Sequence, residues 1–370
     1  MILSQKVRLL PTTEQEKQLW KSAGTARFVY NWTLAKQEKN YKDGGKFISN
    51  NDLRKEITTL KKEELCWLKE VSNNVAKQAV KDACDAYKRF FKGGSSFPKF
   101  KSRKKSKPSF YNDTEKLKVK ENVVLIEKVG WVKTSEQLPI GVSYSNPRIS
   151  YDNKYWYVSV GIEKDEIKEE LTDISLGIDL GLKDLAICSD GRVFKNINKS
   201  MVVKKTEKQL KRLQRKVSRK YEENKEGKEF VKTKNIIKLE KKIQLLHRRL
   251  ANIRKNYIHQ TTTSIVKTKP CKIVIEDLNV KGMIKNKHLS DSIRKQCFYE
   301  FRRQIEYKSK FRGIELIVAD RFYPSSKTCS KCGRIKKDLK LSDRIYHCTC
   351  GLHINRDLNA SMNLSKYRSA

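Results

Sequence analysis

The sequence lacks any run of 18 apolar residues, and its first residues, MILSQKVRLLPTTEQ, contain no apolar core. The first absence excludes a membrane-spanning helix, and the second excludes a secretory signal peptide. No GxxxxGK[ST] motif is present, so nothing indicates the use of ATP. The five histidines lie in basic helical stretches or beside a cysteine loop, and no Ser/His/Asp combination is evident. We therefore expect a cytoplasmic protein without a serine-type nucleophile.

Acidic residues are scarce, because 42 Asp and Glu stand against 82 Lys and Arg and leave a net charge of +40 at pH 7. A charge of this size indicates a polyanionic partner, and nucleic acid is the leading candidate. Acidic lipid or a place in the ribosome are the alternatives. The length of 370 residues predicts two or three domains and allows a substantial core.

Nine cysteines, four of them in pairs, indicate a metal site in a reducing compartment and not a disulfide framework. Cys329 and Cys332 form one pair, and fifteen residues separate it from Cys348 and Cys350. This spacing is close to that of a small zinc site. The second pair has one intervening residue fewer, so either Cys348 with Cys350 or His347 with Cys350 would complete the site. The other cysteines are predicted to be small core residues, namely Cys66, Cys84, Cys188, Cys271 and Cys297.

The first half of the chain begins with an alternating pattern that predicts a strand over residues 2–10. A capping box of Thr13 with Glu16 predicts a helix from Thr13, with Gly24 as a weak point. Two further helices are predicted over 49–60 and 74–91. They are followed by a breaker-rich, basic segment, residues 92–108, which contains two phenylalanines. Cations and rings together are typical of binding to single-stranded nucleic acid, and a solvated linker is the alternative.

Short β runs follow between residues 117 and 163, including a hairpin of 148–151 with 155–162. The N-terminal strand could join this sheet. Residues 11–108 would then be a helical insertion in a small β-barrel.

The second half reads as an α/β segment. Apolar runs predict strands over 175–188, 272–278 and 314–319, and residues 289–310 read as helical. Residues 203–223 and 229–266 predict two long antiparallel helices with lysine and arginine outside, a surface for either solvent or nucleic acid.

Three carboxylates occupy unusual places in this half: Asp179 inside a strand, Glu276 at a strand end and Asp357 at the start of a short helix. Such groups are costly in an apolar environment unless they are paired or bind metal. Each alone could form a salt bridge, but three together predict a site for Mg²⁺ or Mn²⁺. Two such ions about 3.5–4 Å apart would activate a water and stabilise the leaving oxygen of a phosphodiester.

Seven short blocks carry a resemblance that runs nearly from end to end: Ala26–Asn31, Phe97–Phe100, Gly130–Thr134, Gly177–Lys183, Glu276–Leu278, Tyr323–Gly333 and Asn355–Ala360. In this order they resemble the TnpB family, transposon-encoded RNA-guided DNA endonucleases related to type V CRISPR effectors. The last three blocks in this order are the specific ones. On this resemblance, Asp179, Glu276 and Asp357 fall on the catalytic acids of the family.

The resemblance implies an α/β plus β-barrel architecture with an RNase H-like (RuvC) nuclease domain and a zinc-ribbon insertion. A wedge-type β-barrel, split by a helical recognition domain, would precede them. The implied boundaries are 1–10 and 109–165 for the barrel, 11–108 for the helical insertion, 174–323 and 353–370 for the nuclease domain with its basic hairpin 203–266, and 324–352 for the ribbon.

The implied partners are a guide RNA and double-stranded target DNA, with Mg²⁺ or Mn²⁺ at the acids and Zn²⁺ at the ribbon. The guide would read the target by base pairing, while the protein reads a short flanking motif. The protein would be a monomer or a dimer on one RNA, associated with a prokaryotic nucleoid. The candidate nucleic-acid contacts are Arg27, Tyr30, Asn31, Phe97, Lys99, Lys101, Arg103, Lys104, Lys105, Trp131 and Lys133.

Two positions depart from the family pattern. The family usually has Asp two positions before its last catalytic acid, where this chain has Asn355, and its second cysteine pair usually has two intervening residues. The alternative hypothesis is therefore a nuclease-inactive, RNA-guided DNA-binding repressor. A transposase that joins DNA ends is a third hypothesis, disfavoured because no end-recognition module is apparent.

Overall fold

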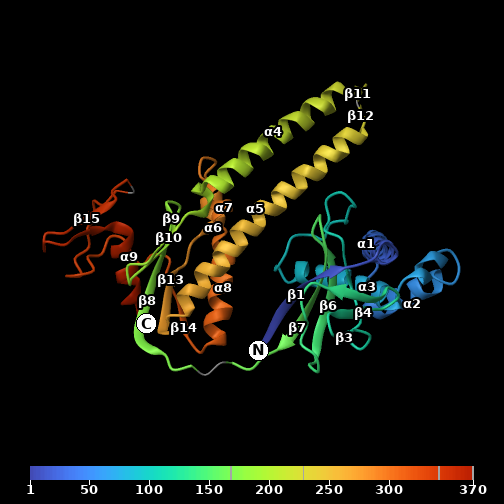
Figure 1. Ribbon diagram of the computed structural model, residues 1–370, viewed down its shortest axis with the longest axis horizontal. Coiled ribbons are helices and arrows are strands. Elements are labelled where there is room, and N and C mark those ends of the chain that lie inside the picture. Colours follow the sequence, from blue (N-terminus) through green and yellow to red (C-terminus); the bar gives the residue numbers. More distant parts are fainter. Residues whose placement is uncertain (167–168, 228, 341, 369–370) are drawn as a thin grey trace. The chain divides into compact units, whose positions relative to one another are not determined.

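The protein, described here by a computed structural model, consists of two compact units, Met1–Lys164 and Asp165–Ala370 (Figure 1). The structure describes residues 1–166, 169–227, 229–340 and 342–368. Each unit has a hydrophobic core of its own. In the part of the chain that the structure describes, no helix combines the length and apolar character needed to cross a bilayer.

The first unit contains a seven-stranded sheet in the order β2-β6-β7-β1-β5-β4-β3. Its strands are β1 (Ile2–Leu10), β2 (Ser109–Tyr111), β3 (Lys118–Lys120), β4 (Val123–Ile126), β5 (Gly130–Thr134), β6 (Tyr144–Tyr151) and β7 (Trp156–Glu163). The predicted hairpin is confirmed as β6 and β7. The N-terminal strand does join this sheet, since β1 pairs antiparallel with both β7 and β5.

Helices fill the chain between β1 and β2: α1 (Thr13–Lys42), α2 (Asn50–Leu60), the short 3₁₀ turn η1 (Cys66–Glu70) and α3 (Asn73–Phe91). The predicted capping box of α1 is displaced by one residue. Thr12, and not Thr13, caps the helix: its hydroxyl accepts the N–H of Gln15 at 3.3 Å, and the Gln15 side chain accepts the N–H of Thr12 at 3.0 Å. Helix α1 continues through Gly24 without a break.

The second unit contains a five-stranded sheet in the order β10-β9-β8-β13-β14. Its strands are β8 (Thr172–Leu180), β9 (Asp184–Cys188), β10 (Val193–Lys195), β13 (Pro270–Glu276) and β14 (Glu315–Ala319). Strands β8, β9 and β10 pair antiparallel, whereas β13 runs parallel to both β8 and β14. The carboxyl ends of three neighbouring strands, β8, β13 and β14, therefore lie at one edge of the sheet.

Helices cover both faces of this sheet (Figure 1). Side chains of α5 (Lys234–Val266) and α8 (Phe298–Phe311) share a core with Leu176 and Ile178 of β8. On the other face, Leu364 of α9 (Arg356–Ser365) packs in a core with Val274 of β13 and Ala319 of β14. The predicted helix over 289–310 is interrupted, because Cys297 adopts a left-handed conformation with φ +56° and separates α7 (Ser290–Gln296) from α8.

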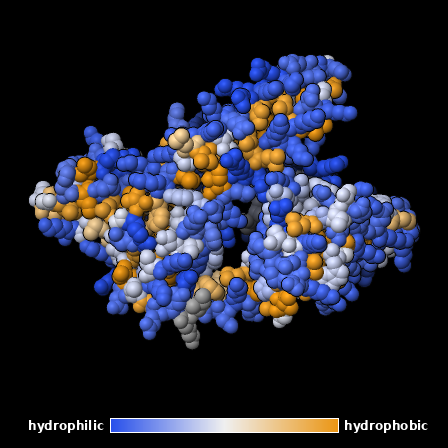
Figure 2. Space-filling model, in the orientation of Figure 1, coloured by the Kyte–Doolittle hydropathy of each residue, from blue (hydrophilic) through white to orange (hydrophobic). Residues whose placement is uncertain are grey.

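Helix α4 (Met201–Glu223) and the first part of α5 form an antiparallel two-helix arm (Figure 1). Apolar side chains hold the arm together around a small core of Val203, Leu210 and Leu250. Helix α5 begins later than predicted, since β11 (Lys225–Glu226) and β12 (Glu229–Phe230) form a small hairpin at the tip. Figure 2 shows that hydrophilic residues dominate this face of the arm, with apolar side chains gathered along it.

The unpaired cysteines do not all lie in the core. Cys84 and Cys188 are buried as predicted, and Cys271 and Cys297 are partly exposed. Cys66 is exposed, so its prediction as a core residue was wrong, because the turn η1 buries mainly Leu68.

Candidate carboxylate site and cysteine cluster

The parallel pairing of β8 and β13 brings Asp179 and Glu276 together at one edge of the sheet. Ile178 lies opposite Ile275 in the register of the two strands, so the next residue of each strand is a carboxylate. Since side chains alternate along a strand, these two carboxylates lie on the same face. Both positions follow directly on buried apolar residues, which is why the acids are held in a poorly solvated environment.

The pKa values of these acids indicate one electrostatic cluster that includes Asp357. Burial, followed by the charges of Glu276 and Asp357, raises the pKa of Asp179 well above its ordinary value. Burial also raises the pKa of Glu276 to about 7, and the charge of Asp357 adds to this, against a hydrogen bond from the Leu180 backbone that lowers it. The charge of Asp357 thus opposes the ionisation of both Asp179 and Glu276, a situation that a divalent cation would relieve.

Asp357 reaches the site from the far end of the chain, on the first turn of α9. The side chain of Asn355 caps this helix and accepts the backbone N–H groups of Asp357 at 3.0 Å and Leu358 at 3.2 Å. Asparagine and aspartate are equally good at this position. The departure from the family pattern at Asn355 therefore leaves the start of α9 properly capped.

Helix α9 packs directly on β8, and Gly177 makes this close approach possible. A Cβ atom at Gly177 would lie 2.0 Å from the Ser361 carbonyl oxygen and 2.4 Å from the Ser365 nitrogen. The Ser175 hydroxyl also donates to the Ser365 carbonyl at 2.6 Å. Because Gly177 is two residues before Asp179, this contact fixes the strand and the helix that carry two of the three acids.

An arginine neutralises Asp357. The Arg356 guanidinium lies 3.0 Å from Asp357 Oδ1, and the Arg344 guanidinium is 4.0 Å from Oδ2. The three acids offer the hard oxygen ligands that Mg²⁺ and Mn²⁺ prefer, so the kind of donor fits such an ion, although the oxygens are not gathered as closely as the sulfurs of the two cysteine pairs.

Four cysteine sulfurs make a separate metal-ligating cluster. The Sγ atoms of Cys329, Cys332, Cys348 and Cys350 all lie within 4.8 Å of one another, and within the described ranges no other group of three or more His, Cys, Asp or Glu side chains comes so close together. Two Sγ pairs, Cys329 with Cys350 and Cys332 with Cys348, are 3.6 Å apart. Tetrahedral Zn–S bonds of about 2.3 Å require S···S separations of about 3.8 Å, so the cluster fits Zn²⁺.

The shortened second pair is accommodated by a tight turn. Gly351 has φ +83°, its N–H donates to the Cys348 carbonyl at 3.0 Å, and the Cys348 N–H donates to the Leu352 carbonyl at 2.9 Å. Both sulfurs consequently point into the cluster. The alternative ligand His347 lies outside it, with its ring 4.2 Å from that of His353 in the hairpin of β15 (Ile345–His347) and β16 (His353–Asn355).

Two buried asparagines of α9 connect the cysteine cluster to the helix that carries Asp357. Asn359 accepts the Ser330 N–H at 2.9 Å and donates to the Thr328 carbonyl at 2.7 Å. Asn363 donates to the same carbonyl at 2.6 Å. The residues on both sides of Cys329 are thereby bound to α9. The sequence signal for this link was two asparagines spaced i, i+4 on one helix face.

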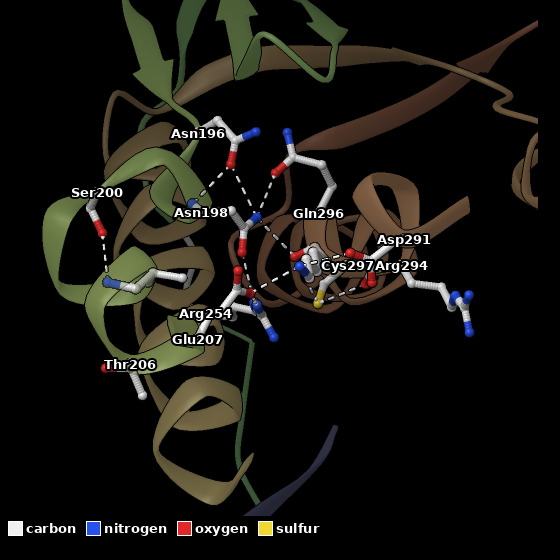
Figure 3. Close-up of polar contacts among 12 residues, drawn as sticks. Asn196, Asn198, Ser200, Thr206, Glu207, Arg254, Asp291, Arg294, Gln296 and Cys297 are labelled. Carbon is white, nitrogen blue, oxygen red and sulfur yellow. Dashed lines mark hydrogen bonds and ion pairs between the residues drawn. The ribbon is translucent and has the colours of Figure 1, made fainter. Parts of the chain in front are cut away.

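The chain just after Asp179 is also held by side chains from other elements. Gln296 donates to the Gly181 carbonyl at 2.7 Å, and Asn196 donates to the Leu182 carbonyl at 2.8 Å. Figure 3 shows Gln296 and Asn196 within a larger network at the base of the arm.

Arg254 is at the centre of that network. It donates to Asn198 at 2.7 Å and to Glu207 at 2.8 Å, and Asn198 in turn donates to Gln296 at 3.2 Å (Figure 3). The base of the α4–α5 arm is thus connected by hydrogen bonds to the loop that follows Asp179.

The structure gives two of the predicted nucleic-acid contacts an internal partner. Tyr30 is buried, with the Lys101 ammonium 3.6 Å from the centre of its ring. The Asn31 amide donates to the Lys101 carbonyl at 2.8 Å and accepts the Lys101 N–H at 2.7 Å. Tyr30 and Asn31 therefore bind the basic segment 92–108 to helix α1.

The other predicted contacts are more open to solvent. Phe97 is 48% exposed, although its ring packs against Tyr87 and Phe90. Trp131 lines a groove of about 470 Å³ together with Lys120, whose ammonium is 4.9 Å from the centre of the indole ring. Arg27 is half-buried, and the remaining predicted contacts that are exposed are Lys99, Arg103, Lys104, Lys105 and Lys133. Their binding to nucleic acid stays a prediction.

Comparisons with known proteins give consistent matches along the chain. Three family models match, described as "Helix-turn-helix domain" over residues 1–46, "Probable transposase" over 157–287 and "Cas12f1-like, TNB domain" over 298–364. Residues 1–46 contain strand β1 followed by helix α1.

Two curated relatives match nearly the whole chain. "Putative RNA-guided DNA endonuclease InsQ" of Escherichia coli (strain K12) is 33% identical over 97% of this chain and 90% of its own length. "Putative RNA-guided DNA endonuclease" of Streptomyces pristinaespiralis is 31% identical over 97% of this chain and 87% of its own length. Among solved structures, a Cas12f1 chain in complex with sgRNA and target DNA has the same fold, with a TM-score of 0.59 at 17% identity over 95% of this chain and 82% of that chain.

Proposed function

Because this chain belongs to the TnpB family, we propose that it is an RNA-guided DNA endonuclease of a transposon, which cuts target DNA next to a short flanking motif by metal-dependent hydrolysis. The observation that carries the proposal is the cluster of Asp179, Glu276 and Asp357 on β8, β13 and α9. The pKa values of Asp179 and Glu276 are raised by burial, and the charge of Asp357 contributes to both shifts. End-to-end similarity to relatives named as RNA-guided DNA endonucleases supports the same activity.

The strand order β10-β9-β8-β13-β14, with three antiparallel strands followed by two parallel ones, supports an RNase H-like (RuvC) nuclease domain over 174–323 and 353–370. The antiparallel seven-stranded sheet supports a wedge-type barrel over 1–10 and 109–165, split by a recognition insertion over 11–108. The cysteine cluster and the TNB match support a zinc ribbon over 324–352.

In the proposed mechanism, Asp179, Glu276 and Asp357 would hold Mg²⁺ or Mn²⁺ through carboxylate oxygens. The bound metal would activate a water and stabilise the leaving oxygen of the phosphodiester. Asp179 and Glu276 must lose their protons before they can act as ligands, since their pKa values are raised in the absence of a cation. Arg356 keeps Asp357 paired with a cation of the protein itself until then.

The ribbon has a structural role in this proposal. Cys329, Cys332, Cys348 and Cys350 would hold Zn²⁺ as thiolates. The backbone N–H of Cys350 lowers the pKa of the Cys348 thiol to about 6, whereas burial and hydrogen bonds with the neighbouring thiols raise that of Cys350 to about 11. Zinc would therefore displace a proton from Cys350 when it binds. Through Asn359 and Asn363, the ribbon would fix the position of α9.

Guide RNA and double-stranded DNA are the proposed partners, with the protein acting as a monomer or as a dimer on one RNA. In a strongly basic chain, contacts with the phosphates supply most of the affinity for such partners. Base pairing between the guide RNA and the DNA would select the target sequence. The proposed contacts lie in the basic segment 92–108 and beside Trp131.

The alternative of a nuclease-inactive repressor has no structural observation in its favour. Asn355 caps α9, the short second cysteine pair closes into the cluster, and all three acids are present.

The decisive experiment begins with sequencing the RNA that co-purifies with the protein. The loaded protein is then given a plasmid that carries the matching target next to a randomised flank. We expect cutting in Mg²⁺ that depends on one flanking motif. Asp179→Ala and Glu276→Ala should abolish cutting while target binding remains. Cutting that survives in either variant, or in buffer without Mg²⁺ and Mn²⁺, would refute the assignment of the acids.

A further inference from the structure

A pair of arginines lies beside Glu276 and has no part in the metal site. Asp277, the residue after Glu276, accepts a hydrogen bond from Arg302 of α8 at 3.0 Å and another from Arg321, which follows β14. The two guanidinium groups bind opposite oxygens of this carboxylate, Oδ1 and Oδ2. Residues from three separate elements thus converge at the edge of the sheet where the acids lie.

This trio carries an uncompensated positive charge. One carboxylate faces two guanidinium groups, and in the described part of the chain no other acid forms an ion pair with Arg302 or Arg321. The arginine side chains are 45% and 48% exposed, and each guanidinium has five N–H donors, most of which remain available.

The arginines line a small cavity that has Glu276 in its wall. The cavity has a volume of about 250 Å³ and is also lined by Lys281 and Tyr299. Tyr299 is 75% exposed, and its ring is therefore open to a ligand. Two planar donor groups held in place, a further lysine and an exposed ring are the combination that binds a phosphate with an adjacent base.

We propose that Arg302 and Arg321 bind a phosphate of the DNA strand to be cut, next to the bond at the carboxylate site. Asp277 holds the two guanidinium groups in orientation, and Tyr299 offers its ring to a neighbouring base. The strand to be cut is the ligand, and not the guide RNA, because the cavity shares Glu276 with the site of hydrolysis. This inference rests on the proposed nuclease function.

The test compares Arg302→Gln, Arg321→Gln and the double variant in an Asp179→Ala background, where no cutting disturbs the measurement. A labelled single-stranded DNA oligonucleotide is titrated with the RNA-loaded protein in Mg²⁺ and followed by fluorescence anisotropy. Because hydrogen bonds from charged donors are lost, we expect affinity to fall about 10-fold or more for each substitution. For single strands, the slope of log affinity against log salt should fall by about 0.7 per lost phosphate contact.

Arg303→Gln is the matched control. Arg303 is the next residue on α8, its side chain is 46% exposed, and its guanidinium pairs with Glu300 at 2.9 Å. This change removes the same charge from the same helix. Because Arg303 pairs with Glu300 and does not line the cavity, DNA affinity should remain nearly unchanged. Unfolding midpoints of all variants, and their affinity for the guide RNA, should match those of the background protein.

Equal DNA affinity in the double variant and the control would overturn the proposal, and so would a parallel loss of guide RNA affinity. Since anisotropy needs no cutting, a protein that binds as expected but never cuts, even with an intact Asp179, would refute only the nuclease function. If the wild type does cut, Arg302→Gln and Arg321→Gln should raise KM for a short single-stranded substrate more than they lower kcat.

Discussion

Gly177→Ala tests whether the close contact between α9 and β8 sets the position of Asp357. The added methyl group would lie 2.0 Å from the Ser361 carbonyl oxygen and 2.4 Å from the Ser365 nitrogen, both of them backbone atoms of α9. Non-bonded heavy atoms need about 3.5 Å, so the helix must move away by about 1–1.5 Å. No side-chain rotation can relieve the contact, because the obstructing atoms belong to the backbone.

This displacement should affect both the stability of the fold and the rate of cutting. Overpacking of this kind costs about 1–3 kcal/mol, which is less than the total stability of about 5–15 kcal/mol for a typical domain, so the variant should fold. A misplacement of about 1 Å at a catalytic group can reduce the rate about 100-fold. We therefore expect a lower unfolding midpoint together with a loss of cutting much larger than the loss of folded protein.

Single-turnover cutting at a temperature well below the unfolding midpoint measures the second effect alone, with target binding and zinc content as parallel readings. Gly24→Ala is the control, because a Cβ at Gly24 meets nothing within 4 Å and the position is helical. Alanine there should leave cutting unchanged and stabilise the protein by up to about 1 kcal/mol. Wild-type cutting and stability in Gly177→Ala would refute the idea that α9 depends on this contact.

Three further predictions concern the zinc, the pH dependence and the basic segment. The purified protein should contain one zinc, and Cys329→Ser should remove it and reduce cutting more than RNA binding; an active protein without zinc by elemental analysis would contradict this. Without Mg²⁺, the unfolding midpoint should fall as the pH rises, because the folded pKa of Glu276, about 7, lies above its ordinary value of 4.5. The stability from the protonated acid is complete below about pH 4.5 and is lost as the pH rises through 7, so Glu276→Gln should flatten the fall between pH 5 and 8. Replacing the exposed cations of the basic segment by alanine should reduce the slope of log RNA affinity against log salt, and an unchanged slope would make the segment a linker; the residues to change are Arg103, Lys104 and Lys105.

Local patterns were sufficient for most of the strands and for the placement of the acids. A run of apolar residues interrupted by one carboxylate predicted strand β8 with Asp179 inside it, and the same pattern predicted β13 with Glu276 at its end. Both are local signals, since period and residue type can be read within a few positions. The meeting of these acids with Asp357 needed the register of β8 with β13 and the packing of α9.

Several details could not be read from the sequence for physical reasons. Thr12 and Thr13 are equivalent as caps in the pattern, and only the hydrogen bonds to Gln15 decide between them. Cys297 ends α7 in a left-handed conformation that a cysteine does not normally signal. Tyr30 and Asn31 read as nucleic-acid contacts, but their partner in the structure is Lys101, 70 residues after Asn31, and such a distant contact has no local signature.

The position of Asp357 depends on three independent contacts because it is separated from Asp179 by most of the second unit. Asn355 fixes the start of α9, Gly177 allows the helix to touch β8, and Asn359 joins it to the backbone beside Cys329. A change at any one of these three places should therefore shift Asp357 relative to Asp179. Asp357 lies on a helix and not on a strand of the sheet. If the ribbon binds zinc as proposed, the free energy of metal binding would therefore help to place this carboxylate, through the hydrogen bonds between Asn359 and the backbone beside Cys329.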